Sequence, residues 1–348
     1  MLNPHLRQAV ASAAGIAHAA ELHLVQVSSS GATGAVILHA WLAGERNPRV
    51  VVKTPRDSRL HHTLRTEWDA VRALREDPTL ARLIPAALAT FRLDGAEYFV
   101  YEGARGRTMY SRYRNRILWS RAGMLERFAV QALSALLCIH TTASRAVAAP
   151  EIAADMQRDL AWLERTLHDL PRAVSGTARA MADRLARSAH GLPVGRVHGD
   201  FSPYNLVTES MGRDARVALI DWEHSELERP QHLDVFRFIG ACALMGLRGG
   251  SRLSAFAHMP TRDATLTRHL LRPWLQDMGG AGAAAAWLEP SMLEALWWHY
   301  WVHAARREQE RRATPADSAG ATYLPALARL AVQTPADWQC QSGGAYAT

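Results

Sequence analysis

The sequence predicts an α+β chain with a strand-rich N-terminal part and a mainly helical C-terminal part. Its 348 residues are enough to bury a large core and to form two lobes. Before residue 104, short runs of β-branched and aliphatic residues bounded by Gly, Pro and Ser indicate strands. After residue 104, most apolar residues recur at helical spacing. We therefore predict one lobe over residues 1–103 and a second over residues 104–348.

The bulk composition is that of a soluble globular enzyme, with 48% hydrophobic and 21% charged residues. No run of 18 apolar residues exists, so no transmembrane helix is expected. The apolar stretches near the N-terminus are interrupted by polar residues and lack a cleavage pattern, which favours a helix over a signal peptide. The three cysteines are odd in number and far apart. They fit reduced thiols of a cytoplasmic protein better than a disulfide framework.

The formal net charge of +7 raises the question of a nucleic-acid partner. The arginines are spread through predicted helices, and no compact basic run alternates with aromatic residues. We therefore expect no nucleic-acid partner. Of the 40 basic residues only Lys53 is a lysine. A chain so rich in Arg is expected to keep a Lys where the planar guanidinium group of Arg cannot replace the compact ammonium group of Lys.

The first strands surround a turn of small residues at 28–34. Strands are expected over 22–27, 35–41 and 50–53. In the turn, Ser30, Gly31 and Gly34 would let backbone N–H groups approach phosphate oxygens, although an ordinary hairpin turn has the same composition. The third strand is apolar until it ends at Lys53.

A helix is expected over 57–75, because its apolar residues form one stripe. Glu67 lies beside that stripe, and Glu76 is an alternative partner for Lys53 by residue type, at a worse spacing. A hairpin over 86–101 is predicted by Asp94-Gly95, a strong turn signal. Glu102 and Gly103 follow it directly.

The C-terminal part reads as helices around a short strand-rich segment. Helices are expected over 122–142, in two pieces of 151–190 split near Pro171, and over 233–247, 262–278, 290–312 and 323–332, with loops at 249–250 and 279–282. Arg105 and four further arginines up to residue 116 form either a solvated basic face or a surface for an anion or a membrane. The aromatic cluster at 297–301 either packs in the core or lines a cage for a quaternary amine.

The segment from 196 to 222 carries the chemistry. Short strands at 194–197, 205–208 and 217–220 place Asp200, Asn205 and Asp221 near their ends. Two carboxylates and one amide oxygen are hard ligands that suit Mg²⁺, which neutralises and orients phosphate groups.

His198-Gly199-Asp200, Asn205 and the strand ending before Asp221 resemble the catalytic loop and metal-binding acid of the protein kinase-like fold. The His-Gly-Asp form is similar to the aminoglycoside phosphotransferase and choline kinase family. The resemblance implies a bilobal kinase-like fold that uses ATP and Mg²⁺. It implies that Asp200 accepts the proton of a substrate hydroxyl or orients that hydroxyl. Asn205 and Asp221 would hold Mg²⁺, and His198 would support the loop.

In the N-terminal lobe the resemblance implies that Lys53 contacts the α- and β-phosphates, steadied by Glu67. Ser30, Gly31 and Gly34 would then form a phosphate loop. Glu102 and Gly103 would lie at the hinge that binds the adenine. These two residues complete the expected cofactor-binding set.

The resemblance also places Asp234 as a structural buttress of the catalytic loop. His140, which closes its helix as in this family, is expected to be a packed core histidine.

Three departures separate the chain from protein kinases. Gly199 stands where protein kinases carry Arg, and Trp222-Glu223 replaces the Phe-Gly after the metal-binding acid. Eight residues between Asp221 and Pro230 leave little room for an activation segment. These departures favour transfer to a hydroxyl of a small molecule such as an aminoglycoside, an amino alcohol or a sugar-like metabolite. The alternatives are a nucleotide-binding pseudokinase or scaffold and, with less support, a protein kinase.

The acceptor itself stays open. Glutamates at 223, 226 and 228 either face a cationic substrate or are solvated loop charges. The basic balance of the chain weighs against a polycationic acceptor, which prefers an acidic cleft. The sequence does not indicate an oligomeric state.

Overall fold

The computed structural model describes residues 4–28, 35–57, 61–114, 121–142, 144–210, 212, 215–246, 266–312, 327–328 and 331. The chain divides into two compact units, residues 1–116 with 203–225 and residues 117–202 with 226–348. The lobes expected over 1–103 and 104–348 stay a prediction. No helix in these ranges is both long and apolar enough to cross a membrane.

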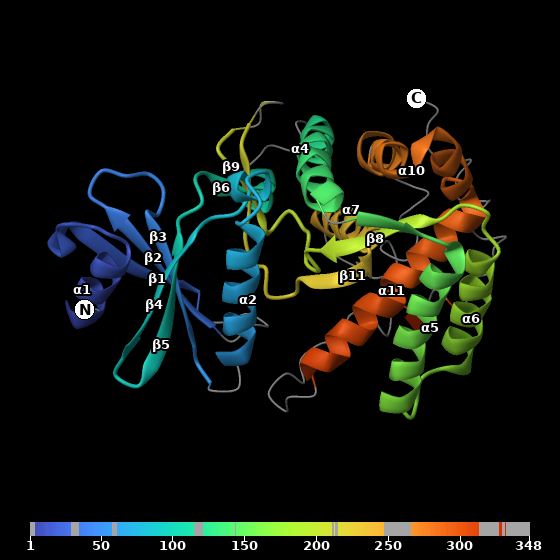
Figure 1. Cartoon of the computed structure of the whole chain (residues 1–348), viewed down its shortest axis with the longest axis horizontal. Coiled ribbons are helices and arrows are strands. Elements are labelled where there is room, and N and C mark those ends of the chain that lie inside the picture. Colours follow the sequence, from blue (N-terminus) through green and yellow to red (C-terminus); the bar gives the residue numbers. More distant parts are fainter. Residues whose placement is uncertain are drawn as a thin grey trace. The chain divides into compact units, whose positions relative to one another are not determined.

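The first unit is built on a five-stranded antiparallel sheet. Its strands lie in the order β1 (Leu22–Ser28), β2 (Ala35–Leu42), β3 (Val50–Pro55), β5 (Ala96–Glu102) and β4 (Ala87–Leu93). Helices α1 (Pro4–Ala13) and α2 (His61–Leu74) lie on opposite sides of this sheet (Figure 1). Leu6 and Val10 of α1 pack against Leu38, Val50 and Val100 to form one buried cluster. The sheet therefore has an apolar face that α1 covers.

The hairpin between β4 and β5 confirms the predicted turn. Asp94 and Gly95 have φ values of 51° and 79°. Two consecutive positive φ values are typical of the tight hairpin turn that favours Asp-Gly. The strand pairing extends from Leu93 opposite Ala96 along the whole hairpin.

A second, three-stranded sheet completes the first unit. It contains β10 (Val217–Leu219), β9 (Leu206–Thr208) and β6 (Arg107–Thr108), and α3 (Met109–Arg114) follows β6. Two short 3₁₀ turns, η1 (Ala19–Glu21) and η3 (Leu80–Arg82), connect other elements. The small sheet joins two distant segments, because β6 pairs with β9 across about 100 residues of chain.

The second unit is mainly helical, as the sequence predicts. Its helices are α4 (Arg121–Thr142), α5 (Ala149–Thr166), α6 (Arg172–Ala186), α7 (His232–Gly246), the π-helical turn η6 (Thr267–Leu271), α10 (Arg272–Trp287) and α11 (Pro290–Arg312). Helices α5, α6 and α11 pack side by side (Figure 1). A three-stranded sheet in the order β11 (Glu226–Pro230), β8 (Leu192–Val197) and β7 (Ser144–Val147) lies among the helices.

One strand of this unit was not expected, and one expected loop needs correction. The segment before Pro230 is a strand, β11, because its backbone pairs with β8. The loop expected at 279–282 is instead a kink inside α10, where Gly280 has φ 80° and ψ 168°. Gly adopts this conformation without a Cβ penalty, so the helix resumes after one residue. The loop at 249–250 and most of the helix at 323–332 lie outside the described residues.

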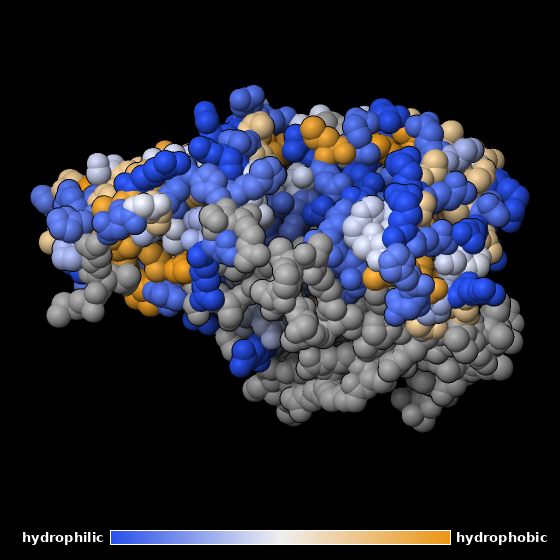
Figure 2. Space-filling model, turned by 90° about the horizontal axis from the view of Figure 1, so that it is seen from below, coloured by the Kyte–Doolittle hydropathy of each residue, from blue (hydrophilic) through white to orange (hydrophobic). Residues whose placement is uncertain are grey.

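The aromatic cluster of α11 packs in the core. Trp297, Trp298, Tyr300 and Trp301 are each at most 2% exposed. Trp297 contacts Phe236 of α7 edge to face at 5.5 Å between ring centroids. The described side chains therefore support the core alternative and not an open cage. Figure 2 shows one face of the molecule, on which hydrophilic residues cover most of the described surface.

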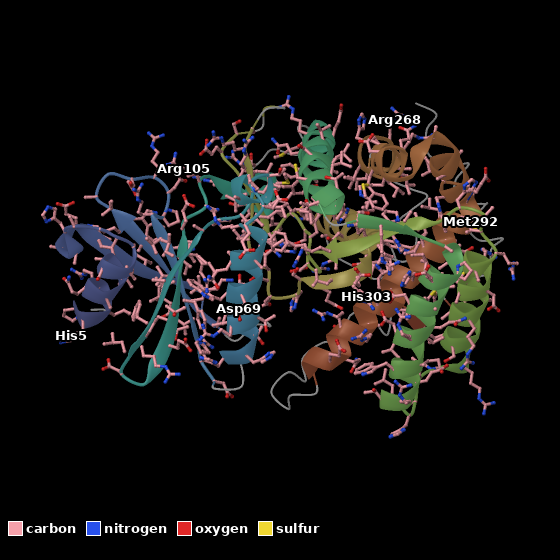
Figure 3. All side chains as sticks on the ribbon, in the orientation of Figure 1. His5, Asp69, Arg105, Arg268, Met292 and His303 are labelled. Carbon is pink, nitrogen blue, oxygen red and sulfur yellow. The ribbon has the colours of Figure 1, made fainter. Side chains whose placement is uncertain are left out.

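A buried charged network connects α5, β11 and α11. Arg229 donates to Asp155 at 2.8 Å and to Asp159 at 2.9 Å, and Arg306 donates to Asp159 at 2.6 Å. His303, labelled in Figure 3, lies 2.8 Å from Asp159 through Nδ1. Burial alone would raise the pKa of Asp159, but the hydrogen bonds and charges of His303, Arg229 and Arg306 hold it well below its ordinary value.

Candidate active site

Lys53, Glu67 and Asp221 form a closed cluster in the first unit. The Lys53 Nζ donates to Oε1 and Oε2 of Glu67 at 2.7 and 2.8 Å and to Oδ1 of Asp221 at 2.9 Å. The side chains of Lys53 and Glu67 are 12% and 3% exposed. Three elements that are distant in sequence therefore meet at one ammonium group.

Local structure explains why these three side chains meet. Along β3 buried residues alternate, so Lys53 points to the side of the strand opposite Val50 and Val52. Glu67 lies on the buried face of α2. Asp221 follows β10 with φ 70°, a left-handed conformation that Asp tolerates better than most residues. Glu76, the alternative partner, is exposed.

The charges in this cluster influence one another strongly. Burial opposes the charge on Lys53, but the carboxylates of Asp221 and Glu67 outweigh it and raise the pKa of Lys53 well above its ordinary value. Burial raises the pKa of Glu67 to about 7, partly offset by Lys53. Lys53 is therefore a permanent cation at neutral pH.

A cavity of about 490 Å³ opens beside this cluster within the first unit. Its walls are mostly apolar and include Ile37, Val51, Val71, Ile84, Val207 and Leu219. Lys53, Glu67, Asn205 and Asp221 all line it. A largely apolar cavity with a few convergent polar groups is typical of a small-molecule or cofactor site.

The donors in this cavity fit a hard divalent cation. Asn205 and Asp221 offer an amide and a carboxylate oxygen from the same wall, and such oxygens are the ligands that Mg²⁺ prefers. Their backbones are linked, because Ile220 N–H donates to the Asn205 carbonyl at 3.1 Å. This hydrogen bond holds the backbone of Asn205 next to the residue that precedes Asp221.

Only one of the two expected hinge residues lines this cavity. Glu102 lines the wall, whereas Gly103 does not, and the Gly103 N–H donates to the Arg49 carbonyl at 3.0 Å. Tyr101 and Ala104, which flank these two residues in the predicted hinge segment, also line the cavity. Ser30, Gly31 and Gly34 lie outside the described residues.

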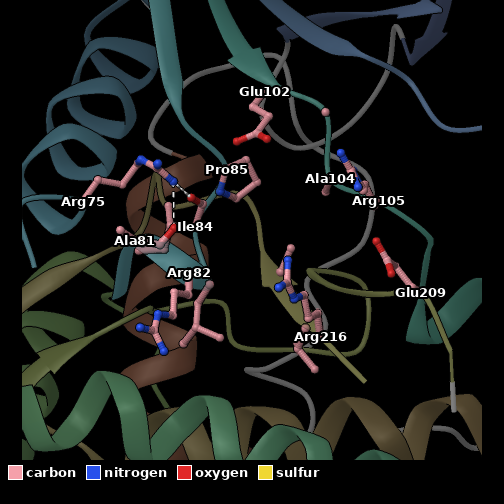
Figure 4. A pocket seen from close by; sticks show the side chains of 14 residues that line it. Arg75, Ala81, Arg82, Ile84, Pro85, Glu102, Ala104, Arg105, Glu209 and Arg216 are labelled. Atoms are coloured by element: carbon pink, nitrogen blue, oxygen red, sulfur yellow. Dashed lines mark hydrogen bonds between the residues drawn. The ribbon is translucent and has the colours of Figure 1, made fainter. Parts of the chain in front are cut away.

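A second, basic cavity of about 800 Å³ shares Ile84, Pro85, Glu102 and Ala104 with the first. Figure 4 shows arginines and two glutamates around it, namely Arg75, Arg82, Arg105, Arg216, Glu102 and Glu209. Arg75 donates to the carbonyls of Ala81 and Ile84, as the dashed lines show. Arg82, Arg105 and Arg216 are exposed, which fits a solvated basic face.

His198 and Asp200 belong to the second unit, in the loop that follows β8. The N–H groups of His198 and Gly199 donate to the Asp234 carboxylate at 2.7 and 2.9 Å. Gly199 has φ 80°, a conformation that a residue with a Cβ rarely adopts. The His198 ring is fully buried, and its Nδ1 accepts from the Asp200 N–H at 3.3 Å. These contacts give the loop one backbone shape.

A chain of buried hydrogen bonds supports Asp234 from behind. His140 lies 3.4 Å from Asp234 through Nε2, and Trp274 Nε1 donates to His140 Nδ1 at 2.9 Å. Since Nδ1 accepts, the proton of the neutral ring is on Nε2 and points to Asp234. His140 is fully buried, as expected for a core histidine.

Asp200 has a partner that sequence reasoning missed. Nε of Arg237 donates to Asp200 Oδ1 at 2.7 Å, and a terminal nitrogen of the same guanidinium lies 2.6 Å from that oxygen. The two residues are 37 positions apart. Nothing in the spacing of the sequence predicts this pair.

Known proteins resemble this chain at the level of family and fold. The model of the phosphotransferase enzyme family matches residues 29–232. No curated protein is significantly similar to the chain. Among solved structures, a mutant aminoglycoside 2′-phosphotransferase-IIIa in complex with GDP is 11% identical, with 98% of each chain covered and a TM-score of 0.54.

A GDP and kanamycin complex of APH(2″)-IIIa is 12% identical, with 97% of this chain and 99% of that chain covered and a TM-score of 0.52. A glucosamine kinase with glucosamine, ADP and inorganic phosphate is 16% identical, with 94% and 81% covered and a TM-score of 0.46. At such identities the likenesses to the two aminoglycoside phosphotransferases show the fold, which is the kinase-like fold that the sequence predicts. Since the family model spans more than half of its residues, the chain belongs to the phosphotransferase enzyme family and is a phosphotransferase of the kinase-like fold.

Proposed function

We propose that this protein transfers the γ-phosphate of ATP, with Mg²⁺, to a hydroxyl of a small molecule. The observation that carries the proposal is the contact of Lys53 with both Glu67 and Asp221 at the wall of the apolar cavity. A fixed ammonium beside oxygen ligands is the constellation that phosphoryl transfer needs for positioning and charge neutralisation.

The predicted site residues of the first unit each have a role in this proposal. Lys53 binds the α- and β-phosphates, and Glu67 holds the ammonium in place. Asn205 and Asp221 hold Mg²⁺, which supplies charge neutralisation at the phosphates when bound. The apolar wall receives the base, with Glu102 at its edge. Gly103 stays a predicted hinge residue, although its N–H is already bonded within the unit.

In the second unit Asp200 acts on the acceptor. Its carboxylate accepts a hydrogen bond from the acceptor hydroxyl, orients it and takes up its proton as the phosphate is transferred. His198 is buried and bonded to the loop backbone, so it supports the geometry and does not exchange protons. The loop position of Asp200 is fixed through Asp234.

The acceptor class follows from the family and from the chain's charge. Aminoglycosides, amino alcohols and sugar-like metabolites all carry reactive hydroxyls, and the two APH-type structures named above contain aminoglycoside kinases. The basic balance of this chain favours weakly charged acceptors over polycations. The three cysteines are odd in number and far apart in the chain, which supports reduced thiols and a cytoplasmic location.

Two measurements on the purified chain test the proposal. Thermal melting with Mg²⁺, with ATP and with both should show the largest rise in Tm for the combination, because ligand binding to the native state stabilises it. GTP serves as the comparison nucleotide. ADP release is then measured with panels of aminoglycosides, amino alcohols and sugars. Absence of any nucleotide-dependent shift, together with no ADP release, would overturn the proposal.

Variants separate the two roles. Asp200→Asn should lower transfer to a small residual rate, about 10²–10⁴-fold below the unchanged protein, and leave the nucleotide-induced Tm shift intact. Asp169→Asn, which changes an exposed carboxylate of the same unit, should change neither. Lys53→Arg keeps the charge but replaces a point charge by a fork, so nucleotide use should weaken. A fully active Asp200→Asn protein is incompatible with the assigned role.

A further inference from the structure

Helix α7 holds four consecutive residues of the catalytic loop. Asp234 accepts the N–H groups of His198 and Gly199. One helical turn further on, Arg237 binds the side chain of Asp200. The next helix residue, Phe238, packs against Phe201, with 5.7 Å between the ring centroids. Residues three and four apart share a helix face, so one face of α7 determines both the backbone and the side-chain geometry of the loop.

The contact at Asp200 has the geometry of a clamp. Two nitrogens of one guanidinium converge on Oδ1, at 2.7 and 2.6 Å. Hydrogen bonds between charged groups are short and directional, and the planar guanidinium limits the rotation of the carboxylate. The side chains of Arg237 and Asp200 are 25% and 23% exposed, so solvent screens the pair only in part.

The loop itself supplies no cation for this purpose. Between Asp200 and Asn205 the sequence is Phe-Ser-Pro-Tyr, and the single lysine of the chain, Lys53, is used in the first unit. A carboxylate that must meet an acceptor hydroxyl loses rate when its orientation is not fixed, because a displacement of about 1 Å can lower the rate about 100-fold.

We infer that Arg237 is a positioning residue for phosphoryl transfer, which fixes the Asp200 carboxylate in the orientation that receives the acceptor hydroxyl. The inference rests on the proposed role of Asp200. It assigns to Arg237 an effect on the transfer step and not on nucleotide binding. The proton still passes from the acceptor hydroxyl to Asp200, and Arg237 stays protonated throughout.

Steady-state kinetics of Arg237→Gln, Arg237→Lys and the control Arg272→Gln test this inference. Arg272 is an exposed arginine at the start of α10 in the same unit. Arg237→Gln should lower kcat about 100-fold and change the nucleotide KM less than about threefold. Arg237→Lys keeps the charge without the fork and should recover part of kcat. Arg272→Gln should match the unchanged protein.

Two further measurements distinguish positioning from a general loss of structure. Guanidinium ions at millimolar concentration should restore part of kcat in Arg237→Ala and have no such effect on Asp200→Asn. The double variant Asp200→Asn/Arg237→Gln should be no slower than Asp200→Asn alone, since Arg237 acts through Asp200. Tm values with and without nucleotide identify any variant that fails to fold. If Arg237→Gln fails to fold, the kcat of Arg237→Lys and the guanidinium rescue of Arg237→Ala decide the inference.

The outcomes separate this inference from the proposed function. If the unchanged protein transfers phosphate and Arg237→Gln has the same kcat as Arg272→Gln, the inference is wrong while the function stands. Additive losses in the double variant would also overturn it. If the unchanged protein transfers no phosphate to any acceptor, the proposed function fails first.

Discussion

Replacing Lys53 by Met removes the cation that donates hydrogen bonds to both Glu67 and Asp221. Met has a similar length and no charge, so the change tests electrostatics more than packing. In the unchanged protein the ammonium of Lys53 lies within 2.9 Å of Glu67 and Asp221. After the substitution the buried carboxylate of Glu67 loses its ammonium partner, and the folded state loses stability.

The magnitude follows from the burial of the pair. Removing one partner of a buried ion pair costs about 3–5 kcal/mol, because the other charge stays buried and unpaired. The side chain of Glu67 is 3% exposed, so this range applies to it, whereas Asp221 at 28% is partly solvated and adds little. Protonation of Glu67 relieves part of the cost, since burial already raises its pKa to about 7.

This relief gives the prediction a pH dependence. The pKa of Glu67 in the folded state lies above its value in the unfolded chain, so its contribution to stability is present at low pH and lost as pH rises through about 7. Without Lys53 nothing offsets the burial of Glu67, and that pKa rises further. The loss of stability in Lys53→Met should therefore be larger at pH 8 than at pH 6.

Urea unfolding at the two pH values measures the effect. Lys53→Met should lose about 3–5 kcal/mol at pH 8, and adding Glu67→Gln to it should recover much of that loss. Glu67→Gln alone is the matched control, in which Lys53 keeps Asp221 as partner. A loss below about 1 kcal/mol at pH 8, or an equal loss with and without Glu67, would refute the electrostatic reasoning.

Three more substitutions test a close backbone contact in the first unit and two buried ionisable groups in the second. Gly106→Ala should lower the free energy of unfolding by about 2–4 kcal/mol, because residue 106 has φ 109° and its Cβ would lie 2.1 Å from the Thr208 carbonyl oxygen. Gly44→Ala is the control and should cost about 1–2 kcal/mol, because residue 44 has φ 83° but a Cβ there meets open space. Equal urea midpoints for the two variants would contradict this. Burial holds the pKa of His232 well below its ordinary value, so the unfolded chain takes up more protons and stability falls as pH drops below about 6.5. His232→Phe should flatten that part of the Tm profile, and an unchanged slope would count against it. Asp159→Asn should cost about 3–5 kcal/mol at pH 7, because it removes the carboxylate that Arg229 and Arg306 share. The cost should be only slightly smaller near pH 3, because the pKa of Asp159 lies well below its ordinary value and the folded protein keeps most of this contribution there; calorimetry at both pH values that shows a large narrowing of the gap would contradict this.

The sequence predicts those features that depend on local chemistry. Alternating apolar residues, with Asp94-Gly95 between them, predict the β4–β5 hairpin because the turn requires two positive φ values. Chain order and the uniqueness of Lys53 single it out, and the helical stripe places Glu67 rather than Glu76 toward it. The hydrogen bonds of Lys53 agree with that choice.

Other features depend on contacts between distant elements. The partner of Asp200 is decided by the rotation of α7 about its own axis, which places Arg237 rather than a neighbour toward the loop. Arg229 looks like a surface residue in the sequence, yet its side chain is 9% exposed and its charge is balanced by two aspartates more than 60 residues away. Periodicity within one segment contains no information about such pairings.

The two units therefore divide the chemistry in a way that substitutions can separate. Lys53, Glu67 and Asp221 belong to the first unit, where hydrogen bonds join them, and the proposed function assigns them to the nucleotide. Asp200 and Arg237 belong to the second unit, where Arg237 of α7 binds Asp200, and the proposed function assigns Asp200 to the acceptor. In the proposed function, a change at Lys53 should therefore alter nucleotide binding, and a change at Arg237 should alter transfer at saturating nucleotide.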